Sequence, residues 1–259
     1  MSRWAGTRFG SRLRIGAIVQ ARMGSRRLPG KALLRLAERP ALTCLLERVS
    51  RARQVDALMV ATTEESDDDA IALLCADRGV ACRRGARDDV GARFEGVLRE
   101  ECFDAFVRLN GDSPFLDPDL IDRSVQLFRE AGPDLVTTAA PRTFPCGQGV
   151  EVVRTDVFLR HRDDHGEPDE HVTGFLYRDP HRYRILGLRN HVDWTDVRLC
   201  LDSPSDFEVL SRLASLFEKP HWEYSLSDLV RLYRDAVALA TTPPDVWPRV
   251  PCDSAKHLP

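Results

Sequence analysis

Short apolar runs alternate with segments of helical periodicity along most of the chain. The runs are rich in β-branched residues, which is typical of buried strands. Between them, leucine and valine recur every three or four residues, as on one face of a helix. This alternation predicts βαβ units and an α/β fold with a mainly parallel sheet. Strands are predicted at residues 15–21, 57–62, 103–109 and 135–139, with another beginning at Val80.

Capping residues mark the ends of the predicted helices. Ser66 and Asp69 have the spacing of a capping box, and Asp117 with Pro118 begins a helix that ends near Gly132. One helix is predicted to begin at Pro40, and others to cover about residues 66–78, 88–101 and 117–131.

The regular alternation breaks down between residues 141 and 195, which we interpret as an inserted cap or arm. A strand is predicted next at residues 197–201, and Ser205 with Glu208 forms the pattern of a capping box for the helix that follows. The inserted segment is predicted to hold strands at 150–153 and 183–188 and helical pieces at 155–164 and 169–178, and a final helix is predicted at 227–238.

The 259 residues are 43% hydrophobic and 30% charged, which is typical of one globular domain with a sizeable core. We assign this domain to residues 14–240, with a flexible leader at 1–13 and a proline-rich tail at 241–259. No apolar run reaches the roughly 20 residues that span a bilayer, so a membrane partner is not expected.

The net charge and the cysteine content indicate which partners and which cellular compartment to expect. The net charge of −3 lacks the basic excess of a duplex-binding protein, so we expect no nucleic-acid partner. The seven cysteines are odd in number and form no CxxC pair, which indicates reduced core residues in a cytoplasmic protein.

A loop rich in glycine and cations follows the first strand, in the sequence ARMGSRRLPGK from Ala21 to Lys31. Loops at the carboxyl ends of parallel strands line the ligand crevice of an α/β sheet. Backbone N–H groups near Gly24 and Gly30, together with fixed cations, suit a polyphosphate. Five residues separate Gly24 from Gly30, and Ala32 replaces the required Ser or Thr, so this is not a Walker A loop.

Two aspartates follow predicted strand ends. Asp112 lies in LNGDSP and Asp202 in LCLDSP. Magnesium that binds with a nucleotide commonly uses one or two carboxylates and completes its shell with phosphate oxygens and water. Asp112 and Asp202 are therefore our predicted Mg²⁺ ligands, with a turn residue as the alternative reading of Asp202.

The glycine-rich loop resembles the A-R-x-x-S-x-R-L-P-G-K signature of the CMP-KDO synthetase-like cytidylyltransferases, in particular the spore-coat polysaccharide biosynthesis protein F branch. The resemblance covers about residues 14–215 and implies a Rossmann-like, GT-A-like nucleotide-diphospho-sugar transferase fold with an inserted segment. It also implies that Asp112 and Asp202 hold the metal. The triphosphate-binding positions match Arg22, Ser25, Arg27 and Lys31, with Arg22 and Lys31 expected to be catalytic.

Other segments resemble the same branch. The segment from Asp88 to Arg93 resembles D-D-V-L-x-R, which adds Asp89, Arg93 and Asn110 as nucleotide-binding candidates; a helix N-cap is the alternative for Asp89. The resemblance also implies a homodimer. Glu151, Glu170 and His171 are the corresponding candidates for acceptor binding.

These observations predict an Mg²⁺-dependent enzyme that transfers CMP from CTP to a sugar or sugar acid and releases pyrophosphate. Sugar transfer is less expected, because Asn110-Gly111-Asp112 lacks the first carboxylate of a D-x-D motif. A guanylyl- or uridylyltransferase acting on an amino-sugar phosphate and a nucleotide-binding regulator without catalysis remain alternatives. The choice of cytosine rests on the resemblance alone.

Overall fold

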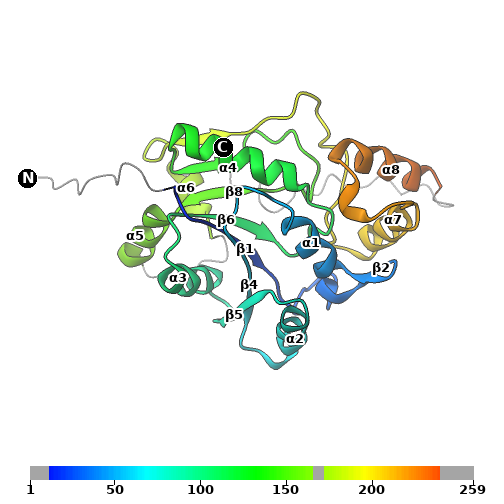
Figure 1. Cartoon of the computed structure of the whole chain (residues 1–259), viewed down its shortest axis with the longest axis horizontal. Coiled ribbons are helices and arrows are strands. Elements are labelled where there is room, and N and C mark those ends of the chain that lie inside the picture. Colours follow the sequence, from blue (N-terminus) through cyan, green and yellow to red (C-terminus); the bar gives the residue numbers. More distant parts are fainter. Residues whose placement is uncertain (1–11, 166–171, 240–259) are drawn as a thin grey trace, which may run out of the picture.

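The computed structural model describes residues 12–165 and 172–239. In this part of the chain a seven-stranded sheet runs through the molecule in the order β5-β4-β1-β6-β8-β7-β9 (Figure 1). The strands are β1 (Ile15–Gln20), β4 (Ala57–Thr63), β5 (Ala81–Gly85), β6 (Ala105–Asn110), β7 (Leu135–Thr137), β8 (Glu151–Arg154) and β9 (Ile185–Gly187).

Strands β5, β4, β1 and β6 are parallel to one another, as the alternating pattern predicted. β8 is antiparallel to both β6 and β7, and β9 is again parallel to β7. The β1–β6 register pairs Gln20 with Asn110, so the carboxyl ends of these two central strands lie side by side. Loops that leave these ends meet at one edge of the sheet.

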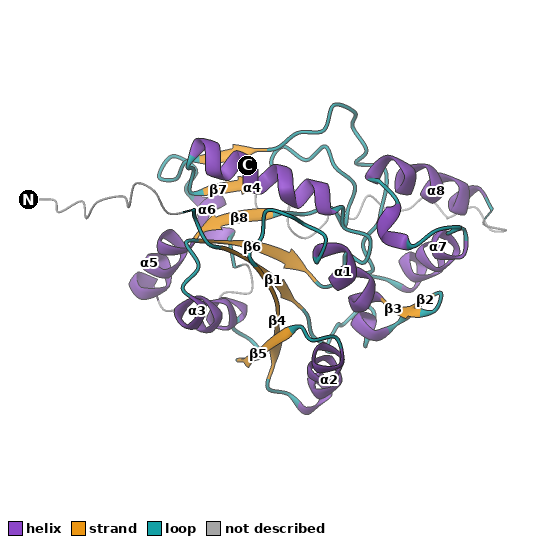
Figure 2. Ribbon diagram, viewed as in Figure 1, coloured by secondary structure: helices purple, strands orange, loops and turns teal. Residues whose placement is uncertain are grey.

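Helices cover both faces of the sheet (Figure 2). One core joins the sheet to α1, α2, α4, α7 and α8, and the other joins it to α3, α5 and α6. Within β1, Val19 belongs to the first core and Ile18 to the second, as the two-residue period of a strand requires. The helices are α1 (Ala41–Val49), α2 (Asp69–Asp77), α3 (Val90–Glu101), α4 (Pro118–Ala131), α5 (Thr155–His165), α6 (Gly174–Arg178), α7 (Pro204–Ser215) and α8 (Leu226–Ala238).

Five short elements complete the described fold. A small hairpin and a 3-10 turn lie between β1 and α1, a second turn precedes α2, and a third precedes α8. No helix in the described ranges is long and apolar enough to cross a membrane. The short elements are η1 (Lys31–Leu33), β2 (Arg35–Leu36), β3 (Arg39–Pro40), η2 (Ser66–Asp68) and η3 (His221–Glu223).

The ends of α4 confirm the capping prediction. The Asp117 carboxylate accepts a hydrogen bond from the backbone N–H of Asp119 at 3.1 Å, Pro118 occupies the first turn, and Gly132 ends the helix in the left-handed region at φ 60°. These residue types are favoured at those positions because they satisfy or avoid unpaired backbone groups.

Two predicted capping boxes were wrong. The cap of α7 is Ser203 with Asp206, two residues before the predicted pair, because Pro204 occupies the first turn of the helix. Ser66 makes no cap, since it lies in η2. The carboxylate of Asp68, the residue just before α2, accepts hydrogen bonds from Met23 and Thr63 instead.

The strand predicted at residues 197–201 was also wrong. Val197, Leu199 and Leu201 are fully buried, which explains the strand-like alternation. Their neighbours are loops, however, and only an isolated bridge pairs Arg198 with Cys146. The alternation of apolar and polar residues shows which side chains are buried. It does not show a strand, because a strand needs a second strand to pair with through hydrogen bonds.

The segment 141–195, predicted as an insertion, contributes two strands to the central sheet. β8 lies between β6 and β7, and β9 forms the edge. The helical piece predicted at 169–178 is seen as α6, and residues 166–171 lie outside the described ranges. Segment 141–195 is therefore part of the same sheet as β1, the strand that leads into the glycine-rich loop.

Gly147 provides a test of how the segment before Asp202 is held. Its φ is +87°, and a Cβ there would lie 2.5 Å from the carbonyl of Leu199. We expect Gly147→Ala to lower the free energy of unfolding by about 2–4 kcal/mol, through strain and displacement of that carbonyl. Gly149→Ala is the matched control, because a Cβ there meets nothing within 4 Å. Urea denaturation of both variants measures the difference, and equal stabilities would contradict the packing described.

Candidate nucleotide-binding site

The glycine-rich loop closes on the backbone of Met23. The Met23 carbonyl accepts hydrogen bonds from the N–H groups of Ser25 at 2.8 Å and Gly30 at 3.0 Å. Gly30 has φ 70°, a left-handed conformation that glycine adopts without strain. The next residue, Lys31, begins η1, so this turn sets where the lysine side chain leaves the loop.

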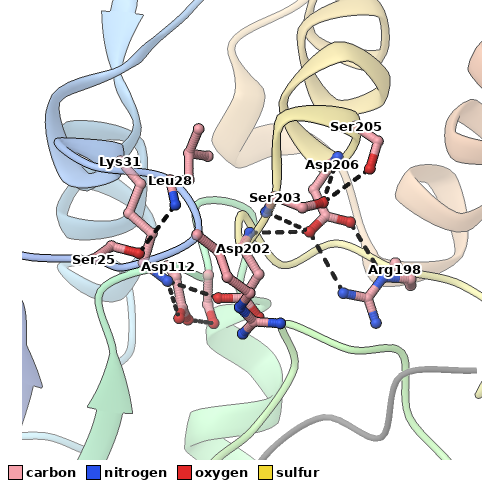
Figure 3. A network of polar contacts seen from close by, with 11 residues as sticks. Ser25, Leu28, Lys31, Asp112, Arg198, Asp202, Ser203, Ser205 and Asp206 are labelled. Carbon is pink, nitrogen blue, oxygen red and sulfur yellow. Dashed lines mark hydrogen bonds and ion pairs between the residues drawn. The ribbon is translucent and has the colours of Figure 1, made fainter.

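Lys31 bridges the two predicted metal ligands (Figure 3). Its Nζ lies 2.8 Å from Oδ2 of Asp112 and 2.7 Å from Oδ1 of Asp202. Arg27 approaches the other oxygen of Asp202 at 3.5 Å. The structure thus brings together four of the predicted site residues at the carboxyl edge of the sheet.

The charges in this cluster shift one another's pKa values. Burial alone would lower the pKa of Lys31, but Asp112 and Asp202 outweigh it and the pKa is raised. The pKa of Asp112 is raised by burial and by the neighbouring Asp202, against the effect of Lys31. Burial also acts to raise the pKa of Asp202, yet Lys31 and Arg27 hold it below its ordinary value. The ammonium group of Lys31 therefore stabilises the charged form of both carboxylates.

Backbone contacts fix the position of Asp112. Gly111 donates its N–H to the carbonyl of Gln20 at 2.8 Å, and a Cβ on Gly111 would lie 2.8 Å from that oxygen. The carbonyl of Asp112 accepts from the N–H of Leu201 at 2.7 Å. The loop after β6 is thereby packed on the end of β1 and tied to the segment that carries the second aspartate.

Asp206 holds Asp202 in place from the first turn of α7 (Figure 3). Its Oδ2 accepts from the backbone N–H groups of Asp202 and Ser203, each at 3.0 Å, and its carboxylate pairs with Arg198 at 3.2 Å. Sequence reasoning missed Asp206 as a supporting residue. The signal was present in Asp202-Ser203-Pro204-Ser205-Asp206, in which the final aspartate has the capping-box spacing to Ser203.

The donor set suits a divalent cation that binds together with a polyphosphate. Asp112 and Asp202 supply hard carboxylate oxygens, and both already share the ammonium group of Lys31. No cluster of three or more His, Cys, Asp or Glu ligands occurs among the described residues. Magnesium needs only one or two carboxylates when phosphate oxygens and water complete its shell. The pair therefore fits such an ion.

Arg22, Arg93 and Asp89 lie on the β5 side of the loop. The guanidinium of Arg93 is buried and donates to the carbonyl of Arg87 at 3.0 Å, and burial together with the charge of Arg22 lowers its pKa. Asp89 caps α3 by accepting from Ala92 N–H at 2.9 Å, which confirms the N-cap alternative. Its carboxylate also pairs with Arg162 at 2.8 Å. Asp89 thus has structural contacts of its own.

Ser25 and Asn110 lie closer to the central cluster. Ser25 accepts from the N–H of Leu28 at 3.4 Å within the loop. Asn110 is the last residue of β6, next to Gln20 and two positions before Asp112. Both residues stand at the edge of the sheet where the loops meet.

Glu151 is held in a buried polar network of described residues that is separate from the hydrogen bonds of Lys31. Its carboxylate accepts from Arg108 at 2.7 Å, the Thr173 hydroxyl at 2.9 Å and the Tyr177 hydroxyl at 2.5 Å. Sequence reasoning missed this network, although an arginine inside the apolar strand AFVRLN was a visible signal. Glu170 and His171 lie outside the described residues.

Comparison with known proteins identifies the family. A family model described as cytidylyltransferase matches residues 16–235. The chain is 32% identical over 225 residues to the spore coat polysaccharide biosynthesis protein SpsF of Bacillus subtilis (strain 168), covering 83% of this chain and 92% of that protein. It is 32% identical over 157 residues to the 3-deoxy-manno-octulosonate cytidylyltransferase of Anaeromyxobacter sp. (strain Fw109-5), covering 60% of each.

A solved structure supports the same assignment. A cytidylyltransferase from Leptospira borgpetersenii serovar Hardjo-bovis (strain JB197) matches with a TM-score of 0.80 and 29% identity, covering 86% of this chain and 95% of that one. These matches confirm the resemblance first seen in the glycine-rich loop. The chain belongs to the cytidylyltransferase family and is a nucleotidyltransferase.

Proposed function

We propose that the protein transfers CMP from CTP to a sugar acid, with a divalent cation, and releases pyrophosphate. The observation that carries this proposal is the pair of carboxylates, Asp112 and Asp202, that share one cation beside the glycine-rich loop. The names of the similar proteins support the acceptor class, since one acts on a sugar acid and another belongs to polysaccharide biosynthesis.

Lys31 and Arg27 would neutralise the triphosphate. Both side chains contact Asp202 and leave the loop that follows β1. Preorganised cations of this kind stabilise charge that develops on a leaving group, and they act most strongly where water is excluded. Arg22, which lies in the same loop, would add to this charge. These residues would therefore hold the β- and γ-phosphates and stabilise the departing pyrophosphate.

Asp112 and Asp202 would hold Mg²⁺, which on binding supplies positive charge at the phosphates. In the transfer, an acceptor oxygen forms a bond to the α-phosphorus, and the bond from that phosphorus to the bridging oxygen of pyrophosphate breaks. The acceptor proton leaves to solvent or to a nearby base. The contribution of this chain is to place two carboxylates and the loop cations around one triphosphate.

The remaining expectations stay predictions. The homodimer and a part for segment 141–195 in binding the acceptor rest on the resemblance, and a cytoplasmic location rests on the cysteine pattern. A monomeric mass in solution at concentrations that support activity would contradict the dimer.

Incubation with each nucleoside triphosphate, Mg²⁺ and panels of sugar acids and sugar phosphates tests the proposed reaction. We expect pyrophosphate release with CTP and a sugar acid, and a CMP-linked product in the mass spectrum. A product formed only from UTP or GTP with a sugar phosphate would favour the alternative transferase. If no combination of triphosphate and acceptor releases pyrophosphate, the result would favour a nucleotide-binding regulator.

The carboxylate pair can be tested by amide substitution. We expect Asp112→Asn and Asp202→Asn to stay folded and to lose at least about 10²-fold in kcat, because an amide keeps the shape and removes the charge that recruits Mg²⁺. Raising Mg²⁺ should partly rescue each variant, and the double variant should be little worse than the poorer single one. Asp119→Asn, at a side chain that is 76% exposed, is the control. Pyrophosphate release against Mg²⁺ concentration gives the answer, and a near-wild-type curve would remove that aspartate from the mechanism.

Lys31→Met tests the shared cation in the absence of ligand. In a chelating buffer we expect the free energy of unfolding to fall by about 2 kcal/mol, less than for a fully buried pair because the side chains are 16–25% exposed. Without the ammonium, burial and mutual repulsion would raise the pKa values of both carboxyls. The folded variant would then take up protons more readily than the unfolded chain, so the deficit should shrink as pH falls from neutral toward 3.8, the ordinary value.

Thermal and urea unfolding between neutral pH and pH 4 measure this deficit. Lys219→Met is the control, because Lys219 is exposed and its ammonium lies over the ring of Tyr224 at 4.6 Å, so it does not bridge two buried carboxylates. A deficit that does not change with pH would contradict the role of Lys31 as counter-charge.

A further inference from the structure

Asp68 is a buried carboxylate at the end of η2, and the proposed transfer of CMP does not involve it. Its side chain is 2% exposed. Oδ1 accepts a hydrogen bond from the backbone N–H of Met23 at 2.6 Å. Oδ2 accepts from the backbone N–H of Thr63 at 3.2 Å and from the Thr63 hydroxyl. The carboxylate thus joins the glycine-rich loop to the end of β4.

Met23 is the residue on which that loop closes. Its N–H points to Asp68, and its carbonyl accepts from Ser25 and Gly30. Gly30 directly precedes Lys31, whose Nζ reaches both metal-site carboxylates. Two hydrogen bonds and the backbone that links them therefore lead from Asp68 through Met23 and Gly30 to the lysine of the site.

The charge of Asp68 also acts on a buried arginine near this edge. Burial and the charge of Arg22 lower the pKa of Arg93, and Asp68 acts in the opposite direction. The negative charge of Asp68 therefore offsets part of the effect that Arg22 has on Arg93. Hydrogen bonds to an ionised acceptor are also stronger than those between neutral groups.

We propose that Asp68 is a positioning residue for the triphosphate: it holds the Met23 peptide so that the loop closes at Gly30 and presents Lys31 to the phosphates. This inference rests on the proposed function, because it takes the loop as the triphosphate site. Asp68 itself touches no reacting atom. Its effect is expected on triphosphate binding, while acceptor binding is unaffected.

The geometry requires a carboxylate at this position. All the groups that Asp68 faces in Met23 and Thr63 are donors, and the two backbone N–H groups cannot turn away. In Asp68→Asn the amide NH₂ must replace one of the two acceptor oxygens, so it faces a donor and one hydrogen bond is lost. Either orientation of the amide loosens the junction between the loop and β4.

Asp122 offers a matched control elsewhere in the fold. It is also a buried aspartate, 8% exposed, and its Oδ1 accepts from the backbone N–H groups of Arg53 and Gln54, each at 2.8 Å. These residues lie in the loop that leads into β4, whereas the triphosphate loop leaves the carboxyl end of β1. In Asp122→Asn the amide oxygen can still accept from both N–H groups, and the NH₂ faces Nε of Arg53, from which Oδ2 accepts at 3.2 Å in the wild type. The variant therefore removes a buried charge and one side-chain contact at a distance from the site.

The experiment compares Asp68→Asn with Asp122→Asn in the full chain. We expect Asp68→Asn to raise KM for CTP at least about tenfold and to weaken inhibition by inorganic pyrophosphate to a similar extent, with KM for the acceptor unchanged. Asp122→Asn should leave KM for CTP at the wild-type value, whatever its effect on the unfolding temperature. Equal KM values for CTP in the two variants would overturn the proposal.

A second substitution and a second measurement keep the test informative if Asp68→Asn folds poorly. Thr63→Val removes one donor to Asp68 and leaves the bond to Met23, so a rise of a few fold in KM for CTP is expected. An unchanged KM in folded Thr63→Val would count against the proposal.

Amide hydrogen exchange in the ligand-free protein separates this proposal from the proposed function. The peptide that covers residues 21–31 should exchange faster in Asp68→Asn than in wild type or Asp122→Asn, and this readout needs no substrate. Faster exchange with no CTP turnover in wild type would leave the positioning of the loop intact and overturn the proposed reaction. Unchanged exchange would overturn the positioning role.

Discussion

The ammonium group of Lys31, shared by Asp112 and Asp202, is the interaction around which the site is arranged. In the sequence, Lys31 is 81 residues away from Asp112 and 171 residues away from Asp202. Two carboxylates this close repel each other unless a cation lies between them. The same negative pair that suits a divalent cation therefore needs a counter-charge in the chain when no ligand is bound. Lys31 supplies it from the loop whose cations suit a triphosphate.

Three loops must meet for that interaction to form, and backbone packing brings them together. Gly111 allows the loop after β6 to lie on the carbonyl of Gln20, and Gly147 allows close approach of Leu199 in the segment before Asp202. The carboxylate of Asp206 then fixes the backbone at Asp202. Each contact depends on a small residue or a correctly placed acceptor, so the position of the charges follows from main-chain geometry.

The two faces of the sheet differ in how they support this edge. The face covered by α1, α4 and α7 is packed with apolar side chains. On the other face, the Glu151 network joins Arg108 of β6 to Thr173 and to Tyr177 of α6. Burial and the charge of Glu151 raise the pKa of Tyr177 well above its ordinary value, so its hydroxyl stays a donor. This network anchors α6 on the sheet.

Most of the order of elements and the location of the glycine-rich loop could be determined from the sequence, because both depend on local signals. Apolar runs of period two, helical runs closed by residues such as Asp117 and Gly132, and an unusual concentration of glycine and cations are all visible in the chain itself. The family resemblance was carried by the same loop. Only the tertiary structure decided which partners each residue meets.

The strand-like segment before Asp202 shows the limit of local signals, since its burial pattern was correct and its partners were loops. Glu151 and Asp89 stay predicted ligand-binding residues, but the sequence did not show that Arg108 and Arg162 pair with them in the fold. The contact between Asp68 and Met23 could not be predicted from the sequence, because Met23 lies 45 residues earlier and no residue near Asp68 in the chain indicates it. Periodicity records whether a side chain is buried, and the identity of its neighbours is set only when distant segments pack together.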